Sequence, residues 1–316
     1  MNTPLFSIII PHFSIPNLLQ RSLSSIPERE DIQVIVVDDD SPDHDQYPVS
    51  FPALFRPGVQ WIQAPHHGGA GYCRNLGLDK AEGKWLLFAD ADDYFSEEFP
   101  ALLDEYKDSK DDILIFRKRA VMSDDTEIPS NRDEWMDKVF DKAIQTGNPR
   151  LLSFNYWANW AKMFRRDLIC SNGIRFDEIP YSNDVMFSVT AASKAQTVRI
   201  VDRVLYVLTE REGSLTWPNT RKPGEQMIRT EVVIRAQKVM NESGFSEPLF
   251  PLSHSLYKMY YYDRPLYRQF FRRIPEVYPS YWIPLKEMAA YERGPLRKGL
   301  LYAYSLFTYL TTRTAK

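Results

Sequence analysis

The stretch from Lys84 to Asp93, KWLLFADADD, decides the fold class of this chain. Its apolar centre, WLLFA, is short and continuous, as expected of a strand that is buried on both faces. It runs directly into Asp90, Asp92 and Asp93. In parallel sheets covered by helices, ligands bind at the carboxyl ends of the strands. The sequence therefore predicts an α/β sheet with acidic side chains at its binding edge.

Short apolar runs of the same character lie on both sides of this stretch. They are FSIII (residues 6–10), IQVIVV (residues 32–37), Val59–Ile62 and DILIF (residues 112–116). Helical patterns separate them, among them a glycine-rich turn that leads into a helix over residues 68–80. Strands that alternate with helices predict a mostly parallel sheet flanked by helices. The second run ends in Asp38–Asp40, which adds a second group of acids to the same edge.

The composition is that of an ordinary globular protein. The 316 residues carry a net charge of −3, which gives no reason to expect a nucleic-acid partner. The two cysteines, Cys73 and Cys170, lie far apart, which argues against a disulfide framework and fits a reducing compartment. The first residues lack a basic segment and a cleavage site, and no apolar run is long enough to span a bilayer. We therefore expect a cytoplasmic protein.

The pair Asp90 and Asp92 has the form Asp-x-Asp, which offers two carboxylates on one side of an extended chain. A nucleotide diphosphate carries negative charge that must be neutralised before it can leave. Mg²⁺ or Mn²⁺, bound by one or two carboxylates and by the phosphates themselves, neutralises it. The alternative is a solvated acidic turn, because Asp-x-Asp is a common sequence. Two interpretations also exist for VIVVDDDSPD (residues 34–43). Either a carboxylate there accepts hydrogen bonds from a base or ribose, or the segment is a plain turn.

The glycine-rich stretch HHGGAGYCRNLGLDKAEGKW (residues 66–85) allows the backbone to approach a ligand closely. Arg74 lies where a helix would present it, and arginine pairs with phosphate through two hydrogen bonds or stacks on a base. The alternative is a glycine-rich loop followed by a surface arginine. His66 and His67 have no spacing to other His or Cys residues that suits a metal, and we expect them to be loop residues.

In order and spacing, FSIIIPHF, VIVVDDDSPD, GGAGYCRNLG and KWLLFADADD resemble the family 2 glycosyltransferases, which have the GT-A fold. The resemblance continues more weakly through NYWANWAKMFRRDLI, GIRFDEIPYSNDVMF and VLYVLTEREGSLT. It implies a bacterial enzyme that transfers a sugar from a nucleotide diphosphate, usually UDP, to a hydroxyl of a glycan or lipid-linked acceptor. The implied setting is the synthesis of cell-surface polysaccharide or glycolipid, with inversion at the anomeric carbon.

The resemblance also implies roles for individual residues on the donor side of the site. Pro11 and Asp39 would line the nucleoside pocket, and Arg74 would contact the base or the diphosphate. Asp90 would lie near the ribose. Asp92 would be the chief metal ligand, with support from Asp93.

Asp184, in the sequence Ser182-Asn183-Asp184, is the residue that the resemblance suggests as the general base. At the start of a helix its carboxylate would be held ionised by the helix dipole and would accept the proton of the acceptor hydroxyl. The alternative is that Asp184 only caps the helix Val185–Lys194. The chain departs from the family pattern at three places. Asp40 replaces a glycine, Asn183 replaces a glutamate, and Arg211 replaces a metal-binding histidine found in some members, where it would assist the leaving phosphate.

We expect three parts in this chain. Residues 1–120 would form the half of the GT-A domain that binds the nucleotide sugar, residues 121–224 the half that binds the acceptor, and residues 225–316 a helical extension. From Lys258 onward there are eleven Lys/Arg against four Asp/Glu, and LLYAYSLFTYL (residues 300–310) is apolar and aromatic. This combination suits peripheral contact with the inner face of an anionic membrane. The alternative is that the stretch packs on the main domain or on a second subunit.

Other classes of protein fit less well. A nucleotidyltransferase or a dinucleotide oxidoreductase would have a glycine-rich phosphate loop after the first strand, but PHFSIPNLL (residues 11–19) contains no Gly and no Lys. A protein that only binds nucleotide sugars or glycans on the same fold stays open, because of Asp40, Asn183 and Arg211.

Overall fold

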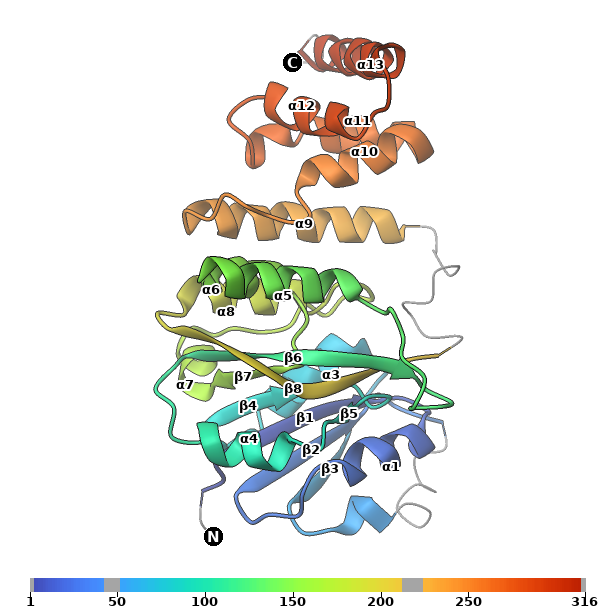
Figure 1. The fold of residues 1–316 in the computed structure, drawn as a ribbon. Helices are drawn as coiled ribbons and strands as arrows, with labels where there is room; N and C mark the ends of the chain where they lie inside the picture. The colour runs from blue at the N-terminus through green and yellow to red at the C-terminus, as the bar shows by residue number, and fades with distance from the viewer. Residues whose placement is uncertain (1–2, 43–51, 212–223, 314–316) are drawn as a thin grey trace. The chain divides into compact units, whose positions relative to one another are not determined.

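The computed structural model describes residues 3–42, 52–211 and 224–313 (Figure 1). The chain divides into two compact units, Met1–Thr220 and Arg221–Lys316. Part of the resemblance noted above, from Glu212 to Thr216, lies outside the described residues, as do Asp43 and Lys316.

The first unit contains one sheet of eight strands in the order β3-β2-β1-β4-β7-β6-β8-β5. The strands are β1 (Phe6–His12), β2 (Ile32–Asp38), β3 (Val59–Gln63), β4 (Trp85–Phe88), β5 (Tyr94–Phe95), β6 (Ile113–Met122), β7 (Lys162–Arg165) and β8 (Val198–Glu210). The first four are parallel to one another, and β6 is parallel to β8. Only β7 and β5 run antiparallel to their neighbours. The prediction of a mostly parallel sheet is thus confirmed.

Helices cover this sheet. They are α1 (Pro16–Ser24), η2 (Pro52–Phe55), α3 (Gly69–Leu78), α4 (Phe99–Tyr106), α5 (Glu134–Thr146), α6 (Pro149–Asn155), α7 (Arg166–Ser171) and α8 (Val185–Lys194). The helix α3 packs on β1 and β2, whereas α5 and α6 contact β6 and β8 (Figure 1). The strand β6 extends beyond the apolar run at residues 112–116 to Met122, and the helices α5 and α6 follow it.

The apolar runs form central strands because both faces of the sheet are covered. Every residue of β2 is buried, and in β1 only Pro11 is partly exposed. Proline lacks a backbone N–H and is normally excluded from central strands. Pro11 is tolerated because β1 pairs with β4 only from Phe6 to Ile9, so that Pro11 lies beyond the end of that ladder.

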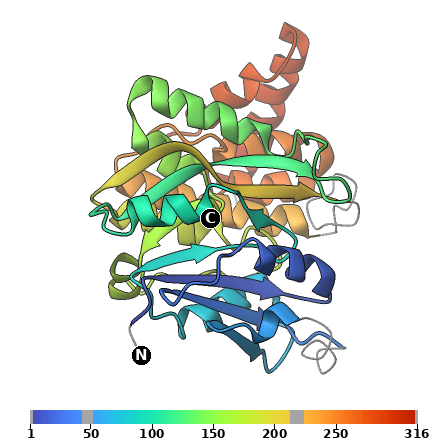
Figure 2. The ribbon, with the colours of Figure 1, turned by 60° about the horizontal axis from the view of Figure 1, so that its bottom comes forward.

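The carboxyl ends of β1 to β4 meet at one edge of the sheet. His12 pairs with Asp38, and Asp38 pairs in turn with Gln63 at the end of β3. Figure 2 shows the blue and cyan strands of this part side by side, with the two longer strands β6 and β8 next to each other. Asp38–Asp40 and Asp90–Asp93 follow two of these strand ends, as predicted.

The second unit is helical, as the sequence predicted for this region. It contains α9 (Glu225–Glu242), α10 (Leu252–Tyr262), α11 (Arg264–Phe271), η3 (Ile274–Glu276), α12 (Trp282–Ala290) and α13 (Pro295–Arg313). Its core includes Leu256, Met259, Tyr267 and Phe271, all nearly inaccessible to solvent. Among the described residues, none of the helices has the length and apolar character needed to cross a membrane.

Candidate active site

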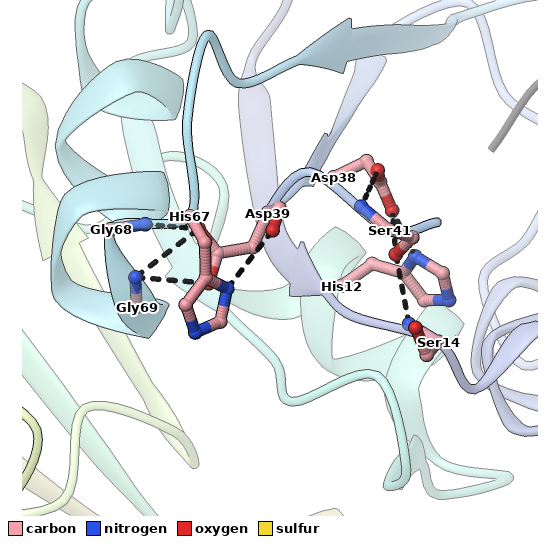
Figure 3. Close-up of polar contacts among 8 residues, drawn as sticks. All are labelled: His12, Ser14, Asp38, Asp39, Ser41, His67, Gly68 and Gly69. Carbon is pink, nitrogen blue, oxygen red and sulfur yellow. Dashed lines mark hydrogen bonds and ion pairs between the residues drawn. The ribbon is translucent and has the colours of Figure 1, made fainter. Parts of the chain in front are cut away.

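Asp39 ties the end of β2 to the beginning of α3 (Figure 3). Its carboxylate accepts hydrogen bonds from the backbone N–H groups of Gly68 at 2.7 Å and Gly69 at 2.9 Å. The Nδ1 atom of His67 lies 3.0 Å from Asp39 Oδ2. A carboxylate is stabilised at a helix N-terminus, where backbone N–H groups and the helix dipole point toward it. Asp39 N donates to His12 O at 2.8 Å, so Asp39 and Pro11 lie on adjoining strand ends.

A buried cluster of His12, Asp38 and Ser41 stabilises the same strand ends, and the sequence had not drawn attention to it (Figure 3). His12 Nδ1 lies 2.7 Å from Asp38 Oδ1, while Ile15 N donates to His12 Nε2 at 3.2 Å. Since Nε2 accepts a hydrogen bond, Nδ1 carries the hydrogen and donates a hydrogen bond to Asp38. Burial opposes ionisation of Asp38, but the hydrogen bonds from His12 and Ser41 prevail and lower its pKa. The signal in the sequence was two polar residues at paired ends of buried strands.

Asp40, one of the three departures from the family pattern, has a φ of 60°. This is the left-handed region, which glycine enters without steric cost and which aspartate tolerates better than most residues. The substitution of aspartate for the expected glycine therefore keeps a backbone conformation that glycine favours.

Arg74 is buried and connects two parts of the site that are far apart in the sequence. Its Nη2 donates to Asp90 Oδ1 at 2.5 Å, and its Nη1 donates to Asn183 Oδ1 at 2.9 Å. The guanidinium carbon lies 5.4 Å from the centre of the Phe176 ring. Only 5% of Arg74 is exposed, so it is not the surface arginine of the alternative interpretation. Its Nε is buried without a hydrogen-bond partner among the described residues.

The segment before Asp184 docks closely on α3. Asn75 Nδ2 donates to Phe176 O at 3.0 Å, and Phe176 N donates back to Asn75 Oδ1 at 2.9 Å. At Gly71 a Cβ atom would lie 2.1 Å from the carbonyl oxygen of Asp177. A glycine is therefore required here for the close approach of the two backbones, as the glycine-rich sequence suggested.

Asp93 is fully enclosed between β5 and β8. Its carboxylate accepts from Thr209 N at 2.7 Å and from the Tyr206 hydroxyl at 3.0 Å, and that hydroxyl accepts from Asp90 N at 2.8 Å. Burial, reinforced by the neighbouring charge of Asp92, raises the pKa of Asp93 well above its usual range. Both oxygens of Asp93 therefore support the acidic loop, and its expected help in holding a metal stays a prediction.

A further side chain that the sequence did not single out, Arg21 of α1, also fixes the acidic loop. Its Nη2 donates to the carbonyl oxygen of Asp92 at 2.6 Å, and its Nη1 donates to Ser123 O at 2.8 Å. Thr209 Oγ1 donates to the same oxygen of Asp92 at 2.7 Å. The backbone of the acidic loop is thus held from two directions, by α1 and by β8.

Asp92 has a cation beside it. Arg211 Nε donates to Asp92 Oδ2 at 3.2 Å, and 18% of the Asp92 side chain is exposed. Burial and the charge of Asp90 raise the pKa of Asp92, and Arg211 only partly offsets this. The excess of negative charge suits a divalent cation. Among the described residues there is no cluster of three or more His, Cys, Asp or Glu side chains suited to a metal. Carboxylate oxygens are ligands that suit Mg²⁺ or Mn²⁺, and metal binding at Asp92 with water and diphosphate oxygens stays a prediction.

Asp184 precedes α8 (Val185–Lys194), whose bounds agree with the predicted helix. Its side chain makes no capping hydrogen bond, so capping alone does not account for it. We expected the helix dipole to hold the carboxylate ionised, but burial outweighs that effect and raises its pKa, although Arg74 favours the ionised form. The residue as a whole is partly exposed, and its role as the general base stays a prediction.

Lys162 on β7 is a buried cation that the sequence analysis overlooked. Its Nζ donates to the carbonyl oxygen of Tyr156 and lies 5.1 Å from the centre of the Tyr156 ring. Burial lowers the pKa of Lys162 to about 7, and the negative charge of Asp184 acts in the opposite direction. The only signal in the sequence was a single charged residue within the stretch NYWANWAKMF.

A comparison with family models finds a match to glycosyl transferase family 2 over residues 7–169, more than half of the chain. Among curated relatives, the uncharacterized glycosyltransferase EpsJ of Bacillus subtilis (strain 168) is 27% identical over 67% of this chain and 63% of its own length. TarS of Staphylococcus aureus (strain MW2), a poly(ribitol-phosphate) beta-N-acetylglucosaminyltransferase, is 27% identical over 66% of this chain and 36% of its own. The matches thus span less than two thirds of the length of these relatives.

Solved structures with the GT-A fold match nearly the whole chain. The crystal structure of S. aureus TarS 1-349 in complex with UDP-GlcNAc has a TM-score of 0.60 and 20% identity, covering 98% of this chain and 92% of that one. The mannosyltransferase PcManGT from Pyrobaculum calidifontis, in complex with GDP-Man and Mn²⁺, has a TM-score of 0.51 and 17% identity, with 99% and 83% covered. This likeness shows that the chain has the GT-A fold.

Proposed function

Because this chain belongs to glycosyl transferase family 2, we propose that it transfers a sugar from a nucleotide diphosphate to a hydroxyl of a glycan or lipid-linked acceptor. The observation that carries the proposal is the buried bridge from Arg74 to Asp90 and Asn183. It holds the acids of the donor side next to the segment that bears Asp184. The acids that bind the donor and the proposed base Asp184 are thereby held in position relative to each other, as a displacement at the anomeric carbon requires.

The donor is bound by residues at the carboxyl edge of the sheet. Pro11 and Asp39 contact the nucleoside, Asp90 the ribose, and Arg74 the base or the diphosphate. A divalent metal, when bound at Asp92 with the support of Asp93, supplies the charge that neutralises the departing diphosphate. Arg211 is close enough to Asp92 to contact the same phosphates once it is displaced from the carboxylate.

Asp184 acts as the general base of an inverting displacement. It accepts the proton of the acceptor hydroxyl while the acceptor oxygen bonds to the anomeric carbon and the bond from that carbon to the diphosphate oxygen breaks. The raised pKa of Asp184 suits this task, because a stronger base is a better proton acceptor near neutral pH.

UDP-N-acetylglucosamine or another UDP-hexose is the donor that we propose. The relative TarS is named for transfer of N-acetylglucosamine to poly(ribitol-phosphate), and its structure was solved with UDP-GlcNAc. By analogy, the acceptor belongs to a bacterial cell-surface polysaccharide, and a lipid-linked one would place the protein at the cytoplasmic face of the membrane.

One observation favours the alternative of a non-catalytic nucleotide-sugar-binding protein. Arg211 forms an ion pair with Asp92, the carboxylate proposed to bind the metal. Such a protein would bind the donor without metal and would not transfer the sugar.

Calorimetry tests the proposal. Binding of UDP, GDP and dTDP is measured with and without Mn²⁺ for the wild-type chain and for Asp92→Ala, with Asp125→Ala as a control outside the proposed site. We expect UDP to bind only with the metal, and Asp92→Ala to lose this binding while the control keeps it. Binding of a nucleotide that is equally tight without metal and in Asp92→Ala would support the alternative.

A further inference from the structure

Helix α13 buries two hydroxyl-bearing side chains and exposes several large apolar ones. Ser305 and Thr308 are 0% and 1% exposed, whereas Leu296, Leu300 and Phe307 are 77%, 58% and 55% exposed. A helix on a surface that faces only water normally has the opposite arrangement. The apolar side of α13 therefore requires an explanation.

Hydrogen bonds fix this orientation. The Tyr267 hydroxyl of α11 lies 2.7 Å from Ser305 Oγ, which itself donates to Leu301 O at 2.7 Å. Thr308 Oγ1 donates to Tyr304 O at 2.9 Å. Rotating the helix to bury its leucines would break the bond between helices and would remove Leu301, which is 0% exposed, from the core. The outward apolar face is thus a stable feature of the second unit.

The exposed apolar residues form a continuous stripe. Leu296, Leu300, Ala303 and Phe307 follow one another at intervals of four, three and four residues, which places them on one side of a helix. Trp282 of α12 is 60% exposed, and its ring centre lies 6.4 Å from that of Tyr302, so it extends the apolar patch beyond α13. Tryptophan is enriched where a protein meets the boundary between water and lipid.

The charges in the part of the sequence that carries the stripe are positive. Between Arg293 and Lys316 the sequence has five Lys/Arg and no Asp/Glu. Arg264 lies 4.3 Å over the ring of Tyr304, and Arg268 Nε donates to the Tyr304 hydroxyl at 2.9 Å. A second copy of this helix would bring the same positive charge against it, whereas an anionic lipid surface brings the opposite charge.

We propose that the apolar stripe of α13, together with Trp282, binds the surface of an anionic lipid bilayer. The helix lies in the plane of the interface, with its leucines among the upper acyl chains and Arg297 and Lys298 at the headgroups. Each Lys or Arg near such a surface increases the affinity about fivefold, so the basic residues and the apolar stripe both contribute to binding. This surface belongs to the second unit, whereas the proposed donor and acceptor residues belong to the first, and its test does not depend on transfer.

The test is cosedimentation of the full chain with vesicles of phosphatidylcholine alone or mixed with phosphatidylglycerol. We expect the wild-type chain to bind the mixed vesicles, and added salt to weaken this binding. Leu300→Glu/Phe307→Glu and, separately, Arg297→Glu/Lys298→Glu should each reduce the binding at least about tenfold. The control is Ile128→Glu, which changes a 51% exposed residue of the first unit and should bind as the wild type does.

Three further measurements, namely circular dichroism, UDP binding and ultracentrifugation without lipid, keep the outcomes distinct. Circular dichroism and metal-dependent UDP binding should be unchanged in all variants, which shows that they are folded and separates this surface from the proposed function. The proposal is overturned if the wild-type chain binds neither kind of vesicle, or if Leu300→Glu/Phe307→Glu binds like the wild type. It is also overturned if ultracentrifugation without lipid shows a dimer that this variant converts to a monomer, because the stripe would then be covered by a second copy.

Discussion

Arg211 Nε donates to Asp92 Oδ2 at 3.2 Å, so the carboxylate proposed to hold a metal already has a cation beside it. A metal ion and the guanidinium therefore compete for one carboxylate. Binding of the donor would resolve this competition, because its diphosphate offers Arg211 a new partner at the moment when the metal takes Asp92.

Arg211→Ala is accordingly expected to bind Mn²⁺ alone several-fold more tightly and UDP with Mn²⁺ more weakly. The first change follows from the freed carboxylate and the second from the lost phosphate contact. Electron paramagnetic resonance of free Mn²⁺ measures the first, and calorimetry measures the second. Arg119→Ala is the control, since Arg119 is an exposed arginine paired with Glu97. Unchanged Mn²⁺ affinity would show that the ion pair does not compete with the metal.

Asp184→Asn should leave metal-dependent UDP binding within about twofold and reduce sugar transfer by a factor of about 10² to 10⁴, the usual contribution of a general base. The amide keeps the size of the side chain but accepts no proton. Transfer to acceptor is followed by release of UDP in a coupled assay. Asp167→Asn, in the first turn of α7, is the matched control and should be fully active. Normal transfer by Asp184→Asn would refute the assignment of the base.

Lys162→Met should move the acid limb of the pH profile of kcat/KM to higher pH. Asp184 must be ionised to act, burial raises its pKa, and the cation of Lys162 lowers it. Because the pKa of Lys162 is itself about 7, Lys162 is charged and favours the ionised form of Asp184 below pH 7, and this effect is lost as the pH rises above 7. Lys84→Met is the control, since Lys84 Nζ likewise donates to a backbone carbonyl, that of Lys107, at 2.7 Å. A uniform loss at every pH would instead indicate a purely structural role.

Gly71→Ala should destabilise the first unit by about 2 kcal/mol, as overpacking of a close contact typically does. The added Cβ would lie 2.1 Å from Asp177 O, so α3 and the segment that leads to Asp184 must separate. Thermal unfolding measures the change, and UDP affinity should fall with it. Gly299→Ala adds a methyl group where no atom lies within 4 Å and should be neutral or slightly stabilising. Equal effects of the two changes would contradict the role given to Gly71.

Local patterns predicted much of this structure. The strands β1 to β4 and the helix α8 follow from apolar runs and helical periodicity, and the acids at the sheet edge follow from the strands that precede them. The extension of β6 to Met122 was not predicted, because it depends on pairing with β8 about 85 residues away. The partners of Arg74 could not be predicted for the same reason. The pKa of Lys162 depends on burial by segments that no local pattern brings together.

The close contact between α3 and the segment before Asp184 also limits how such enzymes can be recombined. A chimera joined near residue 120 would take Gly71, Arg74 and Asn75 from one parent but Phe176, Asp177 and Asn183 from the other. Its two parts would have the same fold, but the side chains and backbones at the contact between α3 and the segment before Asp184 would not fit each other. Exchange of acceptor specificity between relatives should therefore succeed more often when residues 68–79 are transplanted together with residues 121–224, the part expected to bind the acceptor.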